Sequence, residues 1–147
     1  MLGRTHALTG LFVGLLVISV TSVSLIQSFA LVLICIFGSL LPDIDSPKSY
    51  LGRKFKIISW ISKHRGVFHS VIPLAIIYFL TKYFIGQNYA FAFAAGFISH
   101  ILLDMITKEG IHIFPFGFKI RGPVRVGGFL EHMFLLAQIF FIVFIFY

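Results

Sequence analysis

Charged side chains are scarce in this sequence, and cysteine is almost absent. Only 12% of the 147 residues are charged and 59% are hydrophobic, whereas a soluble domain carries about 25% charged residues. This composition excludes an ordinary soluble enzyme and predicts that the lipid bilayer is the solvent. The one cysteine, Cys35, lies inside an apolar run, which excludes an intrachain disulfide and a thiolate metal site. Any metal would need histidine and carboxylate ligands.

Five apolar segments each approach the length of about 20 residues that a membrane-spanning helix needs. They predict an all-α fold, a polytopic transmembrane helix bundle that forms one integral membrane domain over residues 1–147. The segments are residues 7–20, 25–41, 67–85, 89–106 and 129–146. The first is short and runs into the serine-rich stretch 19–24, so a cleaved signal peptide is the alternative interpretation there. We favour a tight hairpin of the first two segments.

Basic residues are concentrated in the two long loops, at residues 42–66 and 107–128. Because positive charge marks the cytoplasmic side, both loops and the N-terminus are predicted to lie in the cytoplasm, and Tyr147 outside it. The sequence thus predicts a multi-pass protein of the cytoplasmic (inner) membrane. Its net charge of +7 indicates contact with acidic lipid headgroups and not with nucleic acid. With this topology, every Asp, Glu and His falls on the cytoplasmic side.

His100 and Asp104 lie one helical turn apart in the fourth apolar segment, so their side chains share a face of the helix. They could form a polar pair at the membrane interface. Ionisable groups in an apolar helix are costly, however, and usually serve a function. The spacing therefore favours joint ligation of a metal ion.

Two carboxylates follow the second apolar segment, at Asp43 and Asp45. Pro42 and Pro47 flank them and prevent the helix from continuing. An Asx turn, in which each carboxylate bonds to nearby amides, is the alternative interpretation. Two acids in a loop otherwise rich in Lys and Arg favour metal binding.

The third segment opens with His64, Arg65 and His69, and Gly66 allows a bend that could bring them together. Imidazole is a ligand for Zn, Mn or Fe, whereas the planar guanidinium of arginine binds phosphate or carboxylate oxygens. Taken alone, the segment would be a basic stretch beside the membrane. A metal site becomes the better interpretation when His100 and Asp104 are considered with it.

Other titratable residues lie at the same membrane depth. His6 opens the first segment, and its position is the only support for a role as a ligand. In the fifth segment Glu131 and His132 are second-tier candidates, which we rank above Glu109 and His112.

These motifs, in this order, resemble the predicted membrane-bound metal-dependent hydrolases, a family of small integral membrane proteins of the YdjM type. The resemblance covers nearly the whole chain and differs at Phe68 and His112. It implies metal-dependent hydrolysis. The matching motifs are Thr5–His6 with Gly10, the stretch from Leu41 to Pro47, His64–Arg65–Gly66 with His69–Ser70, and Ser99–His100 with Asp104 and Gly110.

The leading hypothesis is a metal-dependent hydrolase that acts on a phosphoester or phosphoanhydride of a membrane lipid. One or two divalent ions, Zn, Mn or Fe, would lower the pKa of a bound water for attack on the ester. Asp45 would be the general base, and Arg65 would neutralise charge on a phosphoryl oxygen. The expected metal ligands are His6, Asp43, Asp45, His64, His69, His100 and Asp104.

Two alternatives belong to other functional classes. A metal-ion or proton transporter fits less well, because transport sites tend to lie near the bilayer midplane and these residues lie at helix ends. A non-catalytic membrane protein, in which a metal ion only locks the helices together, would carry the same residues.

Overall fold

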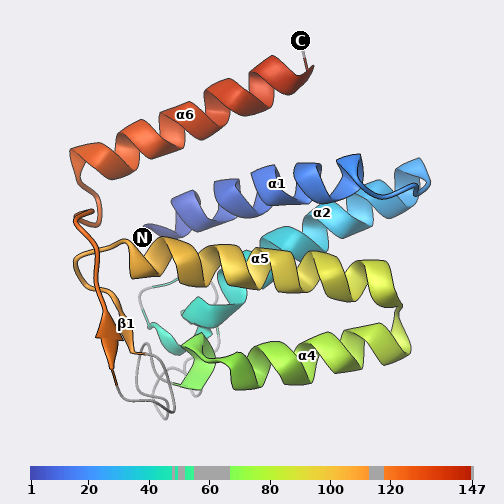
Figure 1. Cartoon of the computed structure of the whole chain (residues 1–147), viewed down its shortest axis with the longest axis horizontal. Helices are drawn as coiled ribbons and strands as arrows, with labels where there is room; N and C mark the ends of the chain where they lie inside the picture. The colour runs from blue at the N-terminus through green and yellow to red at the C-terminus, as the bar shows by residue number, and fades with distance from the viewer. Residues whose placement is uncertain (48, 50–51, 55–66, 113–117, 147) are drawn as a thin grey trace.

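The computed structural model describes residues 1–47, 49, 52–54, 67–112 and 118–146. These residues form five α-helices, two 3₁₀ helices and one two-stranded sheet (Figure 1). In chain order the elements are α1 (Gly3–Ser19), α2 (Leu25–Leu40), η1 (Leu41–Asp45), η2 (Val67–His69), α4 (Val71–Phe84), α5 (Gln87–Met105), β1 (Ile111–His112), β2 (Lys119–Ile120) and α6 (Phe129–Phe146).

The five α-helices coincide with the five apolar segments of the sequence, so the predicted helices are confirmed. Of the described residues, one helical stretch, Leu25–Asp45, is long and apolar enough by itself to cross a membrane. The helices Gly3–Ser19 and Val71–Phe84 and the stretch Phe129–Ile145 are apolar but shorter. That the chain crosses the membrane five times remains a prediction.

Large apolar side chains cover the outer surface of the bundle. Phe29 on α2, Phe79 on α4 and Phe140 on α6 are each about two-thirds exposed, at 66%, 65% and 65%. A helix that is hydrophobic on all sides is either a core helix or one that meets lipid. Since these faces are exposed, they are suited to contact with hydrocarbon.

Small residues bring α2 close to α1 and α5. A Cβ atom at Gly96 of α5 would overlap the carbonyl group of Cys35, and one at Gly38 of α2 would crowd the carbonyl of Phe93. On the other side of α2, a Cβ at Gly10 would meet the side chain of Ser39. Close backbone approach through small residues is typical of helices packed in membranes. It fixes α2 in the centre, between α1 and α5.

The remaining helices pack at the edges of this group. Helix α4 runs beside α5, and α6 lies along α1 on the opposite side of the molecule (Figure 1). Polar side chains cap two helix starts: Ser24 forms a capping box with Gln27, and the side chain of Ser70 accepts from the amide of Ile72.

A small β-hairpin follows α5 in the region that the sequence predicted only as a loop. Ile111 pairs with Ile120 and His112 with Lys119, in antiparallel register. Thr107 forms a further bridge to Val124. The all-α prediction therefore needs this addition, which anchors the C-terminal end of α5.

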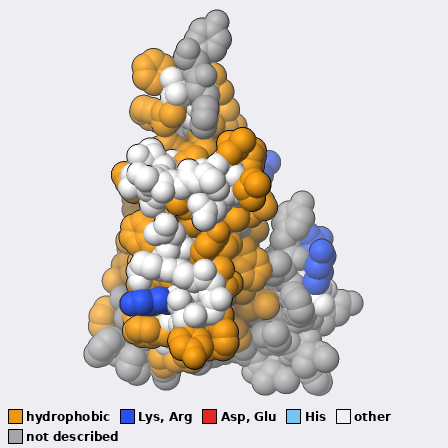
Figure 2. Space-filling view, turned by 90° about the vertical axis from the view of Figure 1, so that its right-hand side faces the viewer, with side chains coloured by type: hydrophobic (Ala, Val, Ile, Leu, Met, Phe, Trp, Pro, Cys, Tyr) orange, Lys and Arg blue, Asp and Glu red, His pale blue; other side chains and the backbone are white. Residues whose placement is uncertain are grey.

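The two ends of the bundle differ in polarity. One end carries the turns that join α1 to α2 and α4 to α5. Figure 2 faces this end and shows mostly hydrophobic and uncharged side chains, with no Asp, Glu or His visible among the residues that are described. Asp43, His69, His100 and Asp104 lie at the opposite end, where α2 and α5 finish and α1, α4 and α6 begin.

Candidate metal centre

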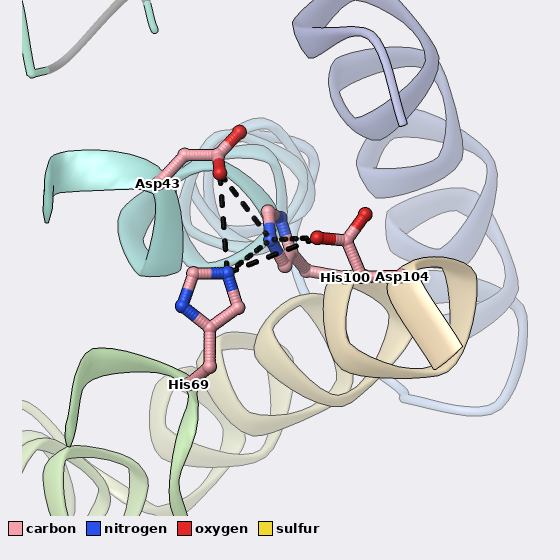
Figure 3. Close-up of side chains that lie close together, drawn as sticks. All are labelled: Asp43, His69, His100 and Asp104. Atoms are coloured by element: carbon pink, nitrogen blue, oxygen red, sulfur yellow. Dashed lines mark hydrogen bonds and ion pairs between the residues drawn. The ribbon is translucent and has the colours of Figure 1, made fainter. Parts of the chain in front are cut away.

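Four side chains from three elements, three of them buried and one partly buried, point toward one another at the polar end of the bundle. They are Asp43 of η1, His69 of η2, and His100 and Asp104 of α5 (Figure 3). Each offers one ligand atom, and the four atoms all lie within 4.8 Å of one another. His69, His100 and Asp104 are at most 3% exposed. We call these four residues the Asp–His group.

The distances within the Asp–His group match those between the ligands of a single ion. Nε2 of His69 lies 3.3 Å from Nε2 of His100. The same His69 atom is 3.9 Å from Oδ1 of Asp43 and 3.8 Å from Oδ2 of Asp104. Nε2 of His100 is 3.8 Å and 3.9 Å from those two oxygens. Ligands about 2.0–2.2 Å from a tetrahedral ion lie about 3.4 Å apart, so small movements would complete the site.

The charges in the Asp–His group also fit a divalent cation. Two carboxylates that lie close together in a buried site repel one another when both are ionised. Two carboxylates and two neutral imidazoles would neutralise a divalent ion, and these are hard and borderline ligands that suit Zn, Mn or Fe. The residues present therefore fit such an ion.

Asp43 is held in place by the end of α2. Pro42 stands at the start of η1, where its lack of an amide hydrogen is tolerated. The carbonyl of Asp43 accepts from the amide of Ser46 at 3.0 Å and from the hydroxyl of Ser49. These bonds fix the backbone of Asp43, and the 3₁₀ turn directs its carboxylate toward α5.

His100 is oriented by a backbone carbonyl of α2. Its Nδ1 lies 2.7 Å from the carbonyl oxygen of Ser39, which can only accept, so Nδ1 carries the hydrogen. Nε2 then has a lone pair directed into the Asp–His group. In a metal-bound histidine, a hydrogen bond made by the ring nitrogen that does not bind the metal typically sets the tautomer. Sequence reasoning missed this contact, because the acceptor is a backbone carbonyl, which every residue carries.

Asp45 lies behind His69 and outside the Asp–His group. Its Oδ2 is 3.5 Å from Nδ1 of His69, and its side chain is fully buried. This is the carboxylate–histidine arrangement that orients an imidazole and raises its basicity toward a metal. Asp45 was predicted as a metal ligand and general base; the structure places it beside Nδ1 of His69, and it is not one of the four residues whose ligand atoms converge.

His6 lies against the Asp–His group without joining it. Its ring stacks on that of His100, with centroids 3.8 Å apart and planes at 19°. Nε2 of His6 is 3.3 Å from Oδ1 of Asp104, which the amino group of Met1 also contacts. Nδ1 of His6 has no hydrogen-bond partner among the described residues. Asp104 therefore uses one oxygen toward His69 and His100 and the other toward α1.

The two second-tier candidates, Glu131 and His132, lie outside the Asp–His group. Glu131 is buried and accepts from the amide of Leu2 at 2.6 Å, the hydroxyl of Thr5 at 2.7 Å and the amide of Gly127 at 2.6 Å. It therefore joins the start of α6 to the start of α1. His132 is exposed and its Nε2 lies 2.9 Å from the guanidinium of Arg4. His64 and Arg65, predicted as ligand and catalytic residue, lie outside the described residues.

Comparison with known proteins gives a consistent picture. The family described as YdjM inner membrane protein matches residues 1–146. The chain is 32% identical over 146 residues to the uncharacterized protein YvsG of Bacillus subtilis (strain 168), covering 92% of this chain and 88% of that protein. It is 37% identical over 119 residues to the inner membrane protein YdjM of Escherichia coli (strain K12), covering 69% of this chain and 59% of that protein. No solved structure matches.

Proposed function

Because the chain belongs to the YdjM family of inner membrane proteins, we propose that it is a membrane-embedded, metal-dependent hydrolase of a lipid phosphoester or phosphoanhydride. The observation that carries the proposal is the convergence of Asp43, His69, His100 and Asp104. Asp43, His69 and the pair of His100 and Asp104 are far apart in the sequence, and three different elements bring them together. A buried group of this composition has no evident purpose in packing apolar helices.

Each residue has a distinct part in the proposed site. Asp43, His69, His100 and Asp104 hold the ion, and Asp45 orients His69 through its Nδ1. A divalent ion held there would activate a water molecule and polarise a phosphoryl oxygen.

Two further groups act on the proton and on the substrate. His6, which stacks on His100, is the neighbouring group best placed to accept a proton, because its Nδ1 makes no hydrogen bond to a described residue. We assign to Arg65, from its place four residues before His69 in the sequence, the binding of an anionic oxygen of the substrate.

The position of the site supports a membrane lipid as the substrate. The Asp–His group lies at the end of α5 and just beyond the end of α2, where the chain leaves its apolar helices. A lipid headgroup would meet the ion there while its tails remained among the helices. A phosphate ester is favoured because arginine beside a divalent ion is the usual arrangement for neutralising phosphoryl oxygens.

The proposal is tested by metal content and then by activity. The purified protein should contain a stoichiometric divalent metal by mass spectrometry, and should release phosphate or a phosphorylated headgroup from phospholipids or prenyl phosphates. Asp43→Asn should lose both the metal and the activity. Glu109→Gln, which neutralises an exposed carboxylate outside the Asp–His group, is the matched control and should retain both.

Three results would contradict parts of the proposal. Protein without metal, or Asp43→Asn with undiminished metal, would remove the metal site. Metal-loaded protein that cleaves carboxyl esters or peptides but no phosphate ester would overturn the substrate class. Metal without any hydrolysis would indicate that the ion only holds η1, η2 and α5 together.

A further inference from the structure

An apolar cavity of about 300 Å³ lies between α4 and α5 and reaches the metal centre. His69 of the Asp–His group forms part of its wall, and Ser70, the N-cap of α4, lies beside His69. The other lining side chains are apolar. They come from the start of α4, from the second half of α5 and from β1, and include Leu74, Phe97, Ile101, Met105 and Ile111.

The cavity has an exposed side and a buried side. Val71, Ile98 and Leu102 line it and are 68%, 46% and 56% exposed, so they form a rim on the outer surface of the bundle. By contrast, Phe97 and Ile111 are at most 1% exposed, and His69 is 3% exposed. The cavity therefore leads from the surface that meets lipid to a side chain of the Asp–His group.

We propose that one hydrocarbon chain of the lipid substrate occupies this cavity between α4 and α5 while the phosphate lies at the Asp–His group. The inference rests on the proposed function, since it assigns a place to the substrate of that same site. The volume of the cavity is near the lower limit of the roughly 300–1,000 Å³ found for ligand pockets. A cavity of this size suits part of a single hydrocarbon chain and not two.

The chemistry of the walls identifies the occupant. Apart from His69 and Ser70, none of the described lining residues offers a hydrogen-bonding side chain, so a polar ligand would leave its own groups unsatisfied against them. In an inner membrane protein the abundant apolar molecules are lipids, and the rim on α4 and α5 faces them. A chain in the cavity would also exclude water from the side of His69 that faces α4.

Photochemical labelling tests the inference independently of turnover. A long-chain alkyl phosphate with a diazirine near the end of its chain would be added to the protein in vesicles of phosphatidylethanolamine and phosphatidylglycerol. After irradiation, mass spectrometry should locate the label within residues 71–74 and 97–105. Labelling spread evenly over α4, α5 and α6 would contradict the inference.

Two tryptophan variants of α4 provide a matched pair. Leu74→Trp fills the cavity and should reduce labelling of residues 97–105 severalfold. Ile76→Trp, at a position 56% exposed and outside the cavity, should leave the labelling unchanged. Equal labelling in both variants would contradict the inference. Metal content and thermal stability of both variants would verify that the fold is retained.

The two proposals fail in different ways. Hydrolysis of a long-chain alkyl phosphate without labelling of the cavity would overturn the chain position and leave the hydrolase intact. Cavity labelling that Leu74→Trp reduces, without hydrolysis of any phosphate ester, would support the lipid-chain site and overturn the proposed reaction. Leu74→Trp should also lower the hydrolysis of long-chain alkyl phosphates more than that of a water-soluble aryl phosphate.

Discussion

At the scale of single residues, the metal centre depends on the direction in which each nitrogen and oxygen points. His100 directs Nδ1 to the carbonyl of Ser39, and His69 directs Nδ1 to Asp45, so both imidazoles present Nε2 to the same place. Asp104 divides its two oxygens between the Asp–His group and His6. The candidate residues of the sequence therefore separate into those that could hold an ion, those that orient an imidazole and those that make structural contacts.

Replacing Asp104 should remove the metal, whereas replacing His132 should not. Asp104 contributes one of four ligand atoms, so Asp104→Ala should lower the bound metal markedly without preventing insertion into the membrane. His132→Ala removes an exposed side chain that contacts Arg4, and its metal content should stay near that of the unchanged protein. Metal per protein, measured by mass spectrometry, checks both. An equal loss in both variants would promote His132 to a ligand.

Asp45→Asn should weaken metal binding without abolishing it. The amide that replaces the carboxylate carries no charge, so it no longer raises the basicity of the His69 ring, and such changes typically cost about 10–100-fold in metal affinity. Titration against a competing chelator would measure the loss, with Asp43→Asn as the variant that should bind no metal. If Asp45→Asn and Asp43→Asn lose metal equally, Asp45 is a ligand in its own right.

At the scale of helices, the sequence predicted which segments are helical, but not how each helix is rotated about its own axis. Apolar runs predicted the helices α1, α2, α4, α5 and α6, and the predicted topology placed every Asp, Glu and His on one side. Whether a side chain turns toward the centre of the bundle depends on how closely the helices approach, which hydropathy does not record. This is why the sequence could not distinguish Asp45, which lies beside His69, and Glu131, which bonds to the start of α1, from the residues of the Asp–His group. The hairpin β1–β2 was missed because its two-residue strands are too short to produce an alternating pattern.

Gly96→Ala should damage the metal centre from a distance. The added Cβ would overlap the carbonyl of Cys35 and push α5 away from α2, and overpacking of this kind costs about 1–3 kcal/mol. Thermal stability and bound metal should fall together, because His100 and Asp43 lie on the two separated elements. Ala137→Leu, at an exposed position of α6, is the control and should change neither. Unchanged metal in Gly96→Ala would show that the site tolerates a shift between helices.

At the scale of the whole molecule, the structure separates a polar end from an apolar end. The Asp–His group lies at the first, and the face shown in Figure 2 is the second. The same division appears in the sequence, where the loops on the polar side carry most of the Lys and Arg residues. We therefore expect the metal centre to face the cytoplasm.

Reporter fusions should verify this orientation. A reporter after Tyr147 should be exposed outside the cytoplasm, and one inserted near residue 50 should remain inside, because five crossings place the two on opposite sides. Enzymatic activity and protease protection of each fusion are the measurements. If both reporters lie on the same side of the membrane, the number of crossings between them is even. One of the two positions would then lie on the opposite side from the one predicted.

The order of the four ligands along the chain has a consequence for biosynthesis. Asp43 emerges from the ribosome first, His69 next, and His100 and Asp104 last, each pair of elements joined by a turn or loop. No early fragment of the nascent chain contains a complete set of ligands. On the proposed function, an ion would meet all four ligands only once the fourth apolar segment lies beside the second, so bound metal would report that these two segments have packed together.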